Sequence, residues 1–263
     1  MQGSQASGAG HRLQAVVLDV DGTLVDSERD GHRIAFNRAF EEADLKDRWG
    51  VELYGKLLDV TGGERRINAY FEEQGIPRGE REQLAGTLHA RKTEIFTEMA
   101  SRGEIEPRPG VSELLDELER VGVRLAVATT GSRQWVGPLL DRLFGLERCE
   151  VVVTSAEAPE RKPDPSAHQL ALKRLDLAAC AAPAVEDSLN GLRAAKSAGL
   201  ACVVVVNDYT REQDFDGADL ILEGFGRPHA PAAVLDDPHG LDPPGRLDLD
   251  TLRRLAARSG SAG

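Results

Sequence analysis

Two aspartates, Asp19 and Asp21, stand one residue apart at the end of an apolar run, in the stretch "AVVLDVDGTLVD". Side chains two residues apart in a strand lie on the same side, so both carboxylates face one small volume past the strand end. Two carboxylates this close repel each other unless a cation lies there or one group stays protonated. A hard cation with oxygen ligands, hence Mg²⁺, fits best. The plain alternative is a turn with capping carboxylates.

Hydroxyl and amine groups follow two later apolar runs. "VRLAVATTGS" ends in Thr129 and Thr130, whose hydroxyls, with the backbone N–H groups of a following helix start, predict an anion site. In "ERKPDP", Lys162 precedes Pro163, which biases Lys162 away from helical geometry, so its ammonium group is placed to meet a phosphate. The alternatives are a helix N-cap at the threonines and a solvated loop lysine.

A second acidic pair, Glu186 and Asp187, stands in "VEDSLNG" at the end of a weaker apolar run. Its carboxylates predict further cation ligands, and the alternative is that Asp187 caps the next helix. The combined groups are those of phosphoryl transfer: a carboxylate nucleophile, an acid–base carboxylate, Mg²⁺, and hydroxyl and positive groups on the phosphate.

Buried parallel strands must bring these groups together. Near-continuous apolar runs predict strands over residues 13–20, 123–130, 149–155 and 200–207, with weaker candidates at 182–187 and 218–224. Helical patterns cover residues 111–122, 164–176 and 188–199. Strands that alternate with helices predict an α/β fold with a doubly wound parallel sheet. Ligands bind such sheets beyond the carboxyl ends of the strands.

The chain divides into four parts by pattern. Residues 1–12 predict a disordered lead, and residues 13–27 with 107–225 predict the α/β core. Residues 28–106 carry only amphipathic helical patterns and predict an inserted all-helical cap domain. Residues 226–263, rich in Pro, Gly and Asp, predict an irregular extension with a final helix near "LDTLRRLAAR".

Composition and charge limit the classes of partner that we expect for this protein. The 263 residues carry a net charge of −12, which argues against nucleic acid as a partner. No run has the length of a membrane span or the pattern of a signal peptide, so we expect no membrane association and a cytoplasmic location. Three scattered cysteines without a CxxC pair predict free thiols in a reducing compartment. We expect a monomer.

The ordered motifs resemble those of the haloacid dehalogenase superfamily. "DVDGTLVD", "VATT", "RKPDP" and "VEDSLNGLRAAKSAG" look like its first to fourth motifs, and together they cover about Leu13 to Asn207. The resemblance implies that Asp19 is the nucleophile and that Asp21 is the general acid and then the general base. It implies that Thr129 and Lys162 hold the phosphoryl group. Asp187, helped by Glu186, would bind Mg²⁺ together with Asp19 and the main-chain carbonyl of Asp21.

The helical insert is similar to the cap of CbbY-like proteins, which are xylulose-1,5-bisphosphate phosphatases. The similarity lies in "LVDSERDGHRIAFNRAF", "LYGKLLDVTGGERRINAYF" and "LHARKTEIF". It implies substrate contacts from Glu28, His32, Gly63 and Arg66. Arg65 is an additional arginine, and we expect the two guanidinium groups and the backbone N–H groups at this helix start to bind a second, distal phosphate. The chain departs from the usual pattern at Glu64, where a lysine is common. Alternatively, the arginines pair with Glu64 or Glu72, and Glu28 and His32 form a solvated helix start.

These observations predict a Mg²⁺-dependent phosphatase of a small phosphorylated sugar, with xylulose-1,5-bisphosphate as the first candidate. The same core residues would serve a mutase of the β-phosphoglucomutase type or a phosphoglycolate phosphatase. A regulator that uses the fold only for binding is disfavoured, because all the core acids are present.

Overall fold

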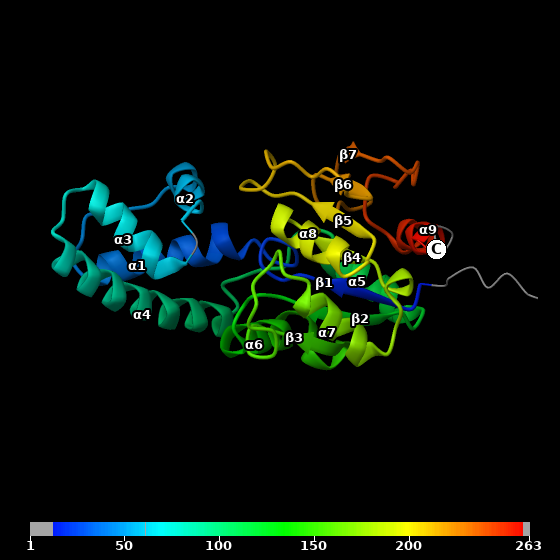
Figure 1. Cartoon of the computed structure of the whole chain (residues 1–263), viewed down its shortest axis with the longest axis horizontal. Coiled ribbons are helices and arrows are strands. Elements are labelled where there is room, and N and C mark those ends of the chain that lie inside the picture. The colour runs from blue at the N-terminus through cyan, green and yellow to red at the C-terminus, as the bar shows by residue number, and fades with distance from the viewer. Residues whose placement is uncertain (1–12, 61, 260–263) are drawn as a thin grey trace, which may run out of the picture.

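A seven-stranded sheet forms the centre of the computed structural model, which describes residues 13–60 and 62–259 (Figure 1). The predicted lead at residues 1–12 lies outside the described residues. The strands are β1 (Ala15–Leu18), β2 (Arg124–Ala128), β3 (Cys149–Val153), β4 (Ala184–Glu186), β5 (Cys202–Val205), β6 (Leu220–Leu222) and β7 (Val234–Asp236). Their order is β3-β2-β1-β4-β5-β6-β7, and all are parallel except β7.

Helices cover both faces of this sheet, which confirms the predicted doubly wound α/β fold. Val16 and Leu18 of β1 pack in one cluster with α5 (Val111–Arg120), α6 (Arg133–Phe144) and α9 (Leu249–Ser259). Ala15 and Val17 pack in the other cluster with α7 (Ser166–Leu175) and α8 (Leu189–Ser197). Successive side chains of a strand point to opposite faces, so a continuous apolar run is what a strand covered on both faces needs.

Between Val25 and Pro107, the described residues form helices and loops, and no strand. They comprise the π-helical turn η1 (Ser27–His32), α1 (Arg33–Glu42), α2 (Val51–Leu57), α3 (Gly63–Glu73) and α4 (Arg78–Arg102). Figure 1 shows α1 to α4 gathered at one end of the molecule, beyond the sheet. Val25 and Pro107 form an isolated antiparallel bridge where the chain leaves and re-enters the core. The domain boundaries at residues 27/28 and 106/107 stay predictions.

The C-terminal extension is more ordered than the sequence indicated. Two short 3₁₀ turns, η2 (Leu146–Arg148) and η3 (Ala179–Ala181), belong to the core and not to this extension. Within the extension, α9 is the helix that the sequence predicted. The prediction of an irregular segment before it was wrong over β7, which pairs antiparallel with β6. This strand has only three residues, and its apolar residues Val234 and Leu235 are exposed. It therefore has no alternation of buried and exposed residues from which a strand could be recognised in the sequence.

Within the described part of the chain, no helix combines the length and the apolar character that crossing a membrane requires. The cytoplasmic location and the monomeric state stay predictions.

Candidate active site

A cavity of about 780 Å³ lies where the carboxyl ends of β1, β4 and β5 face the helical insert. Its core side includes Asp19, Asp21, Thr130, Lys162 and Asp187. Its insert side is formed by residues from η1, α2, α3 and α4. They include Glu28, His32, Gly55, Gly63, Arg65, Arg66, His89 and Lys92. The structure therefore brings the predicted core residues and the predicted cap residues to one cavity, although Thr129 and Glu186 lie behind its wall.

Lys162 joins the ends of β1 and β4. Its Nζ lies 2.5 Å from Asp19 Oδ1 and 2.7 Å from Glu186 Oε1. All three side chains are buried, and His168 on α7 places its Nε2 2.9 Å from the same Glu186 oxygen. Lys162 is therefore not a solvated loop lysine. It is a buried cation that neutralises two carboxylates.

Burial and charge set the protonation of this group. Burial raises the pKa of Asp19 well above its usual range, and Lys162 offsets part of that effect. Burial also opposes ionisation of Glu186, but Lys162 and His168 outweigh it and hold the pKa of Glu186 below its usual value. For Lys162, the two carboxylates outweigh burial and raise its pKa. A charged Lys162 at neutral pH can meet a phosphoryl oxygen beside Asp19.

Asp187 completes an acidic cluster. Oxygen atoms of Asp19, Glu186 and Asp187 lie within 4.8 Å of one another. Burial, and then the charge of Glu186, raise the pKa of Asp187 from 3.8 to about 7. A carboxylate set that resists ionisation when it is empty of cations is the donor set that a hard divalent ion stabilises, so these residues fit Mg²⁺. Glu186 Oε1 contacts Lys162 and His168, and which of these carboxylates bind the ion stays a prediction.

Asp21 lies on the insert side of Asp19 and has different surroundings. Ser27 Oγ donates a short hydrogen bond to Asp21 Oδ1, and His32 Nε2 lies 3.9 Å from the same oxygen. Burial raises the pKa of Asp21 to about 6, against the opposing effect of the Ser27 hydrogen bond. A carboxyl group with a pKa near the working pH can both give and take a proton, which is what acid–base catalysis needs.

A buried pair from the insert, His32 and Lys92, backs Asp21. Lys92 Nζ lies 3.0 Å from His32 Nδ1. Burial, and then the charge of Lys92, lower the pKa of His32 well below 6.5, so its ring is neutral. An ammonium group can only donate, so Nδ1 accepts and the ring proton resides on Nε2, the atom that faces Asp21. Burial also lowers the pKa of Lys92 to about 8.

The two threonines after β2 differ in their positions relative to the cavity. Thr129 is buried, and its Oγ accepts a hydrogen bond from Gly131 N at 3.0 Å. This bond resembles a helix N-cap, which was the alternative interpretation of the two threonines. The hydroxyl proton of Thr129 nevertheless stays available to donate. Thr130 lines the cavity directly. Their roles in phosphate binding stay predictions.

The predicted cap residues fall into an inner and an outer set. The inner set is a chain of hydrogen bonds: Tyr54 Oη donates to Glu28 Oε2 at 2.5 Å, and Arg66 Nη1 donates to Tyr54 Oη at 3.1 Å. Arg66 is buried and also donates to Leu57 O at 2.9 Å. The partners of Arg66 are thus Leu57 O and the hydroxyl and ring of Tyr54, so Arg66 is not half of a surface ion pair with Glu64 or Glu72.

The outer set consists of Gly63 and Arg65 at the start of α3. A Cβ atom on Gly63 would lie 2.7 Å from the His89 ring, so a glycine lets α3 approach α4. Arg65 is exposed at the cavity, and no hydrogen bond or ion pair joins it to another described residue. Arg65 is thus the free guanidinium group of the pair and Arg66 the anchored one.

Several site residues were missed in the sequence. Lys92 follows Leu88 by four positions and precedes Phe96 by four, so it stands on the buried stripe of α4. His168 precedes Leu172 by four on α7 in the same way. A polar residue on an apolar stripe is the signal that was available. Ser27, Arg108 and Asn207 lie in turns or linkers, where no period marks them.

Comparisons with known proteins agree with this geometry. The family described as haloacid dehalogenase-like hydrolase matches residues 13–199. A CBBY-like protein from Arabidopsis thaliana is 40% identical over 222 residues, which cover 81% of this chain and 70% of that protein. Protein CbbY from Cereibacter sphaeroides is 42% identical over 217 residues, which cover 81% of this chain and 93% of that protein.

A solved structure extends the likeness to three dimensions. The crystal structure of a CbbY variant from Rhodobacter sphaeroides, in complex with xylulose-(1,5)bisphosphate, superimposes with a TM-score of 0.67 at 40% identity. The match covers 81% of this chain and 94% of that one. The resemblance read from the four motifs and the insert is confirmed: the chain belongs to the haloacid dehalogenase-like hydrolases and, within them, to the CbbY-like phosphatases.

Proposed function

We propose that this enzyme is a Mg²⁺-dependent phosphatase that hydrolyses a small phosphorylated sugar, with xylulose-1,5-bisphosphate as the first candidate, through an aspartyl-phosphate. The observation that carries the proposal is the pair of aspartates with unlike surroundings. Asp19 lies 2.5 Å from the Lys162 ammonium, whereas Asp21 contacts Ser27 and has a pKa of about 6. Two neighbouring carboxyl groups with different environments suit two different roles.

In the first step, an Asp19 carboxylate oxygen attacks phosphorus, and the bond from phosphorus to the sugar oxygen breaks. Asp21 gives its proton to the leaving sugar oxygen, so the sugar departs as an alcohol. Lys162 and the Thr129 hydroxyl meet the phosphoryl oxygens and oppose their negative charge. The His32 ring is neutral and directs its Nε2 proton toward Asp21, so His32 adds no positive charge that would hold Asp21 ionised.

In the second step, the ionised Asp21 takes a proton from water, and the oxygen of that water attacks phosphorus. The bond from phosphorus to Asp19 breaks, inorganic phosphate leaves, and Asp19 is again a carboxylate. Asp21 regains the proton that it gave in the first step, so the cycle balances.

Asp19, Asp187 and the main-chain carbonyl of Asp21 would hold Mg²⁺, with Glu186 adding negative charge nearby. When bound, this ion would lower the repulsion between the nucleophile and an anionic phosphoryl group. Lys162 fixes Asp19 Oδ1, the oxygen that it contacts. The other carboxylate oxygen of Asp19 is left to meet Mg²⁺ or the phosphorus atom of the substrate.

A bisphosphate substrate is supported by the cations that the insert brings to the cavity. Arg65 has no protein partner among the described residues and lies at the start of α3, where backbone N–H groups are also free. A second phosphate on the sugar would meet Arg65 there, with Arg66 behind it. Glu28 and His32 would contact sugar hydroxyls.

The experiment is a phosphate-release screen over mono- and bisphosphorylated sugars, run with Mg²⁺ and with chelator. We expect stoichiometric phosphate from a pentulose or hexose bisphosphate, phosphoglycolate to be a poorer substrate, and no activity after exhaustive chelation. Interconversion of glucose 1-phosphate and glucose 6-phosphate should be slow. Fast interconversion without phosphate release would instead identify a mutase.

A further inference from the structure

Arg108 stands in the linker that leads from the insert back to the core, outside all four motifs. We propose that Arg108 is a positioning residue, which fixes the turn after Asp21 and the end of β5 so that Asn207 holds Asp187 in the metal site. This inference rests on the proposed Mg²⁺ site.

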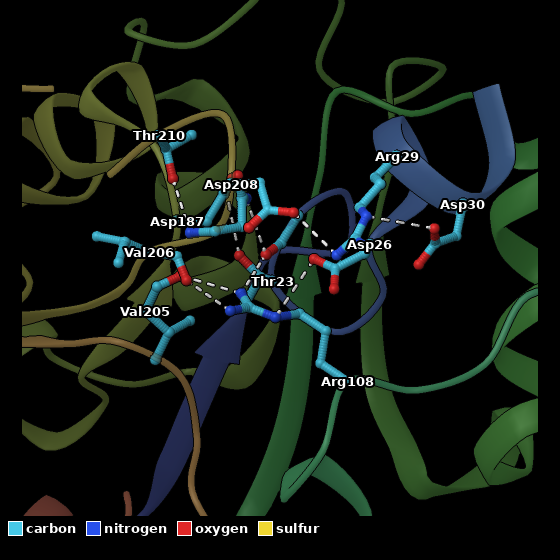
Figure 2. Close-up of polar contacts among 12 residues, drawn as sticks. Thr23, Asp26, Arg29, Asp30, Arg108, Asp187, Val205, Val206, Asp208 and Thr210 are labelled. Atoms are coloured by element: carbon cyan, nitrogen blue, oxygen red, sulfur yellow. Dashed lines mark hydrogen bonds and ion pairs between the residues drawn. The ribbon is translucent and has the colours of Figure 1, made fainter. Parts of the chain in front are cut away.

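The guanidinium group of Arg108 is buried, with 7% of the side chain exposed, and all its nitrogens have partners (Figure 2). Nη1 donates to Val205 O at 3.0 Å and makes a shorter bond to Gly22 O. Nη2 donates to Val206 O at 2.6 Å. Nε lies 3.4 Å from Asp26 Oδ1, the only carboxylate among these partners.

These contacts show why an arginine is needed. Val205 ends β5 and Val206 follows it, and Gly22 turns the chain after β1 with a φ of +82°. Buried carbonyl oxygens require donors, and only the planar, five-proton fork of arginine reaches three of them at once. A lysine ammonium, with three protons on one atom, cannot span the same set.

The two segments that Arg108 holds converge on Asp187. Asn207, the residue after Val206, donates from Nδ2 to Asp187 Oδ2 at 2.7 Å and lies 3.4 Å from Gly22 O. Gly22 itself packs so closely that a Cβ atom there would lie 2.2 Å from the same Asp187 oxygen. The position of the Asp187 carboxylate is therefore set by two backbone segments, and one guanidinium group binds both.

The backbone of Arg108 also binds the segment that leads from β1 into the insert. Its N–H donates to Leu24 O at 2.9 Å, next to the bridge between Val25 and Pro107. On the far side of the β5 loop, Asp208 pairs with Arg29 of η1 at 2.8 Å, as Figure 2 also shows. The loop that carries Asn207 is thus held between Arg108 and the insert, which restricts where Asn207 can place its amide.

The test compares Arg108→Lys with the wild-type protein by calorimetric titration with MgCl₂ alone, without substrate. Residues that hold metal ligands in place typically change affinity or activity by about 10–100-fold when they are replaced. We expect Mg²⁺ binding to weaken by about that factor, and kcat on a phosphosugar to recover at saturating Mg²⁺. Arg148→Lys is the matched control, because Arg148 is also largely buried but pairs with Asp116 and Glu119, which do not line the cavity.

The outcomes separate the two claims. If the wild-type protein binds no Mg²⁺, the proposed metal site fails, and this inference with it. If the wild-type binds Mg²⁺ and a folded Arg108→Lys binds it equally well, the inference alone is overturned. Should Arg108→Lys fail to fold, Asn207→Ala decides, because it removes the amide through which the effect passes and leaves the contacts of Arg108 in place. Unchanged Mg²⁺ affinity in Asn207→Ala would overturn the inference.

Discussion

Lys162 Nζ lies 2.5 Å from Asp19 Oδ1, although the two residues are 143 positions apart in the chain. The parallel sheet makes this contact: Asp19 follows β1, and Lys162 stands in the loop after β3, two strands away in the sheet order. A nucleophile whose carboxylate oxygen contacts a cation is oriented before any substrate arrives, which is the arrangement that phosphoryl transfer to a carboxylate requires.

The contribution of Asp187 to the stability of the Mg²⁺-free protein should fall as the pH rises from 3.8 to about 7. In the folded state the pKa of Asp187 is raised over that interval, so the folded chain holds a proton that the unfolded chain has released. Asp187→Asn removes this effect and should raise the Tm at pH 8 in chelator by at least about 2–4 °C, the shift that 1 kcal/mol gives at this size.

Differential scanning calorimetry at pH 5 and pH 8 measures that difference. The exposed Asp250→Asn on α9 is the control and should leave the pH dependence as it is. If Asp187→Asn has the lower Tm at pH 8, Asp187 is not an uncompensated carboxylate in the folded protein.

His32 should stay neutral across the working pH range, with its proton on Nε2. Nitrogen-detected NMR of the histidine side chains reports both the tautomer and the pKa. In Lys92→Met, the pKa of His32 should rise, because the second cause of its depression has been removed while burial remains. A His32 that titrates near its ordinary value of 6.5 in the wild-type protein would contradict the proposed arrangement around Asp21.

The two neighbouring arginines of the insert should have separable effects. Arg65→Ala should lower kcat/KM for a sugar bisphosphate by about 10-fold or more and spare a generic aryl phosphate, since it removes about 1.5–3 kcal/mol of a charged hydrogen bond to the second phosphate. Arg78→Ala, on an exposed arginine of α4, is the control. Equal losses of Arg65→Ala on both substrates would refute a distal-phosphate role.

Arg66→Ala should also lower bisphosphate turnover more than aryl phosphate turnover, and it should destabilise the insert. The buried guanidinium of Arg66 donates to Tyr54 Oη and to Leu57 O, so its loss removes buried hydrogen bonds from a charged group, at a cost of about 1.5–3 kcal/mol. Urea unfolding measures that cost. If Arg66→Ala keeps wild-type stability and bisphosphate turnover, Arg66 neither supports the cavity wall nor contacts the substrate.

The sheet and the core motifs were predictable because their signals are local. Buried parallel strands appear in the sequence as continuous apolar runs. Asp19 and Asp187 directly follow such runs, and Lys162 lies in the loop after one. The helices of the insert could be predicted from the spacing of their apolar residues, but the contacts between them could not. Lys92 meets His32 only through the packing of α4 on η1, and Arg108 finds its carbonyl partners in the turn after β1 and at the end of β5, far from it in the chain. Contacts of that kind depend on tertiary geometry, which no local period encodes.

The central claim is that Asp19 is the nucleophile, and the most direct test is phosphate release by purified Asp19→Asn on a phosphosugar with saturating Mg²⁺. The fold should persist, because Lys162 keeps Glu186 as a partner and one crowded charge is gone. Circular dichroism and thermal unfolding check this. Turnover should fall by at least about 10³-fold, since loss of a covalent nucleophile costs orders of magnitude in kcat. Substantial phosphate release from folded Asp19→Asn would contradict the account.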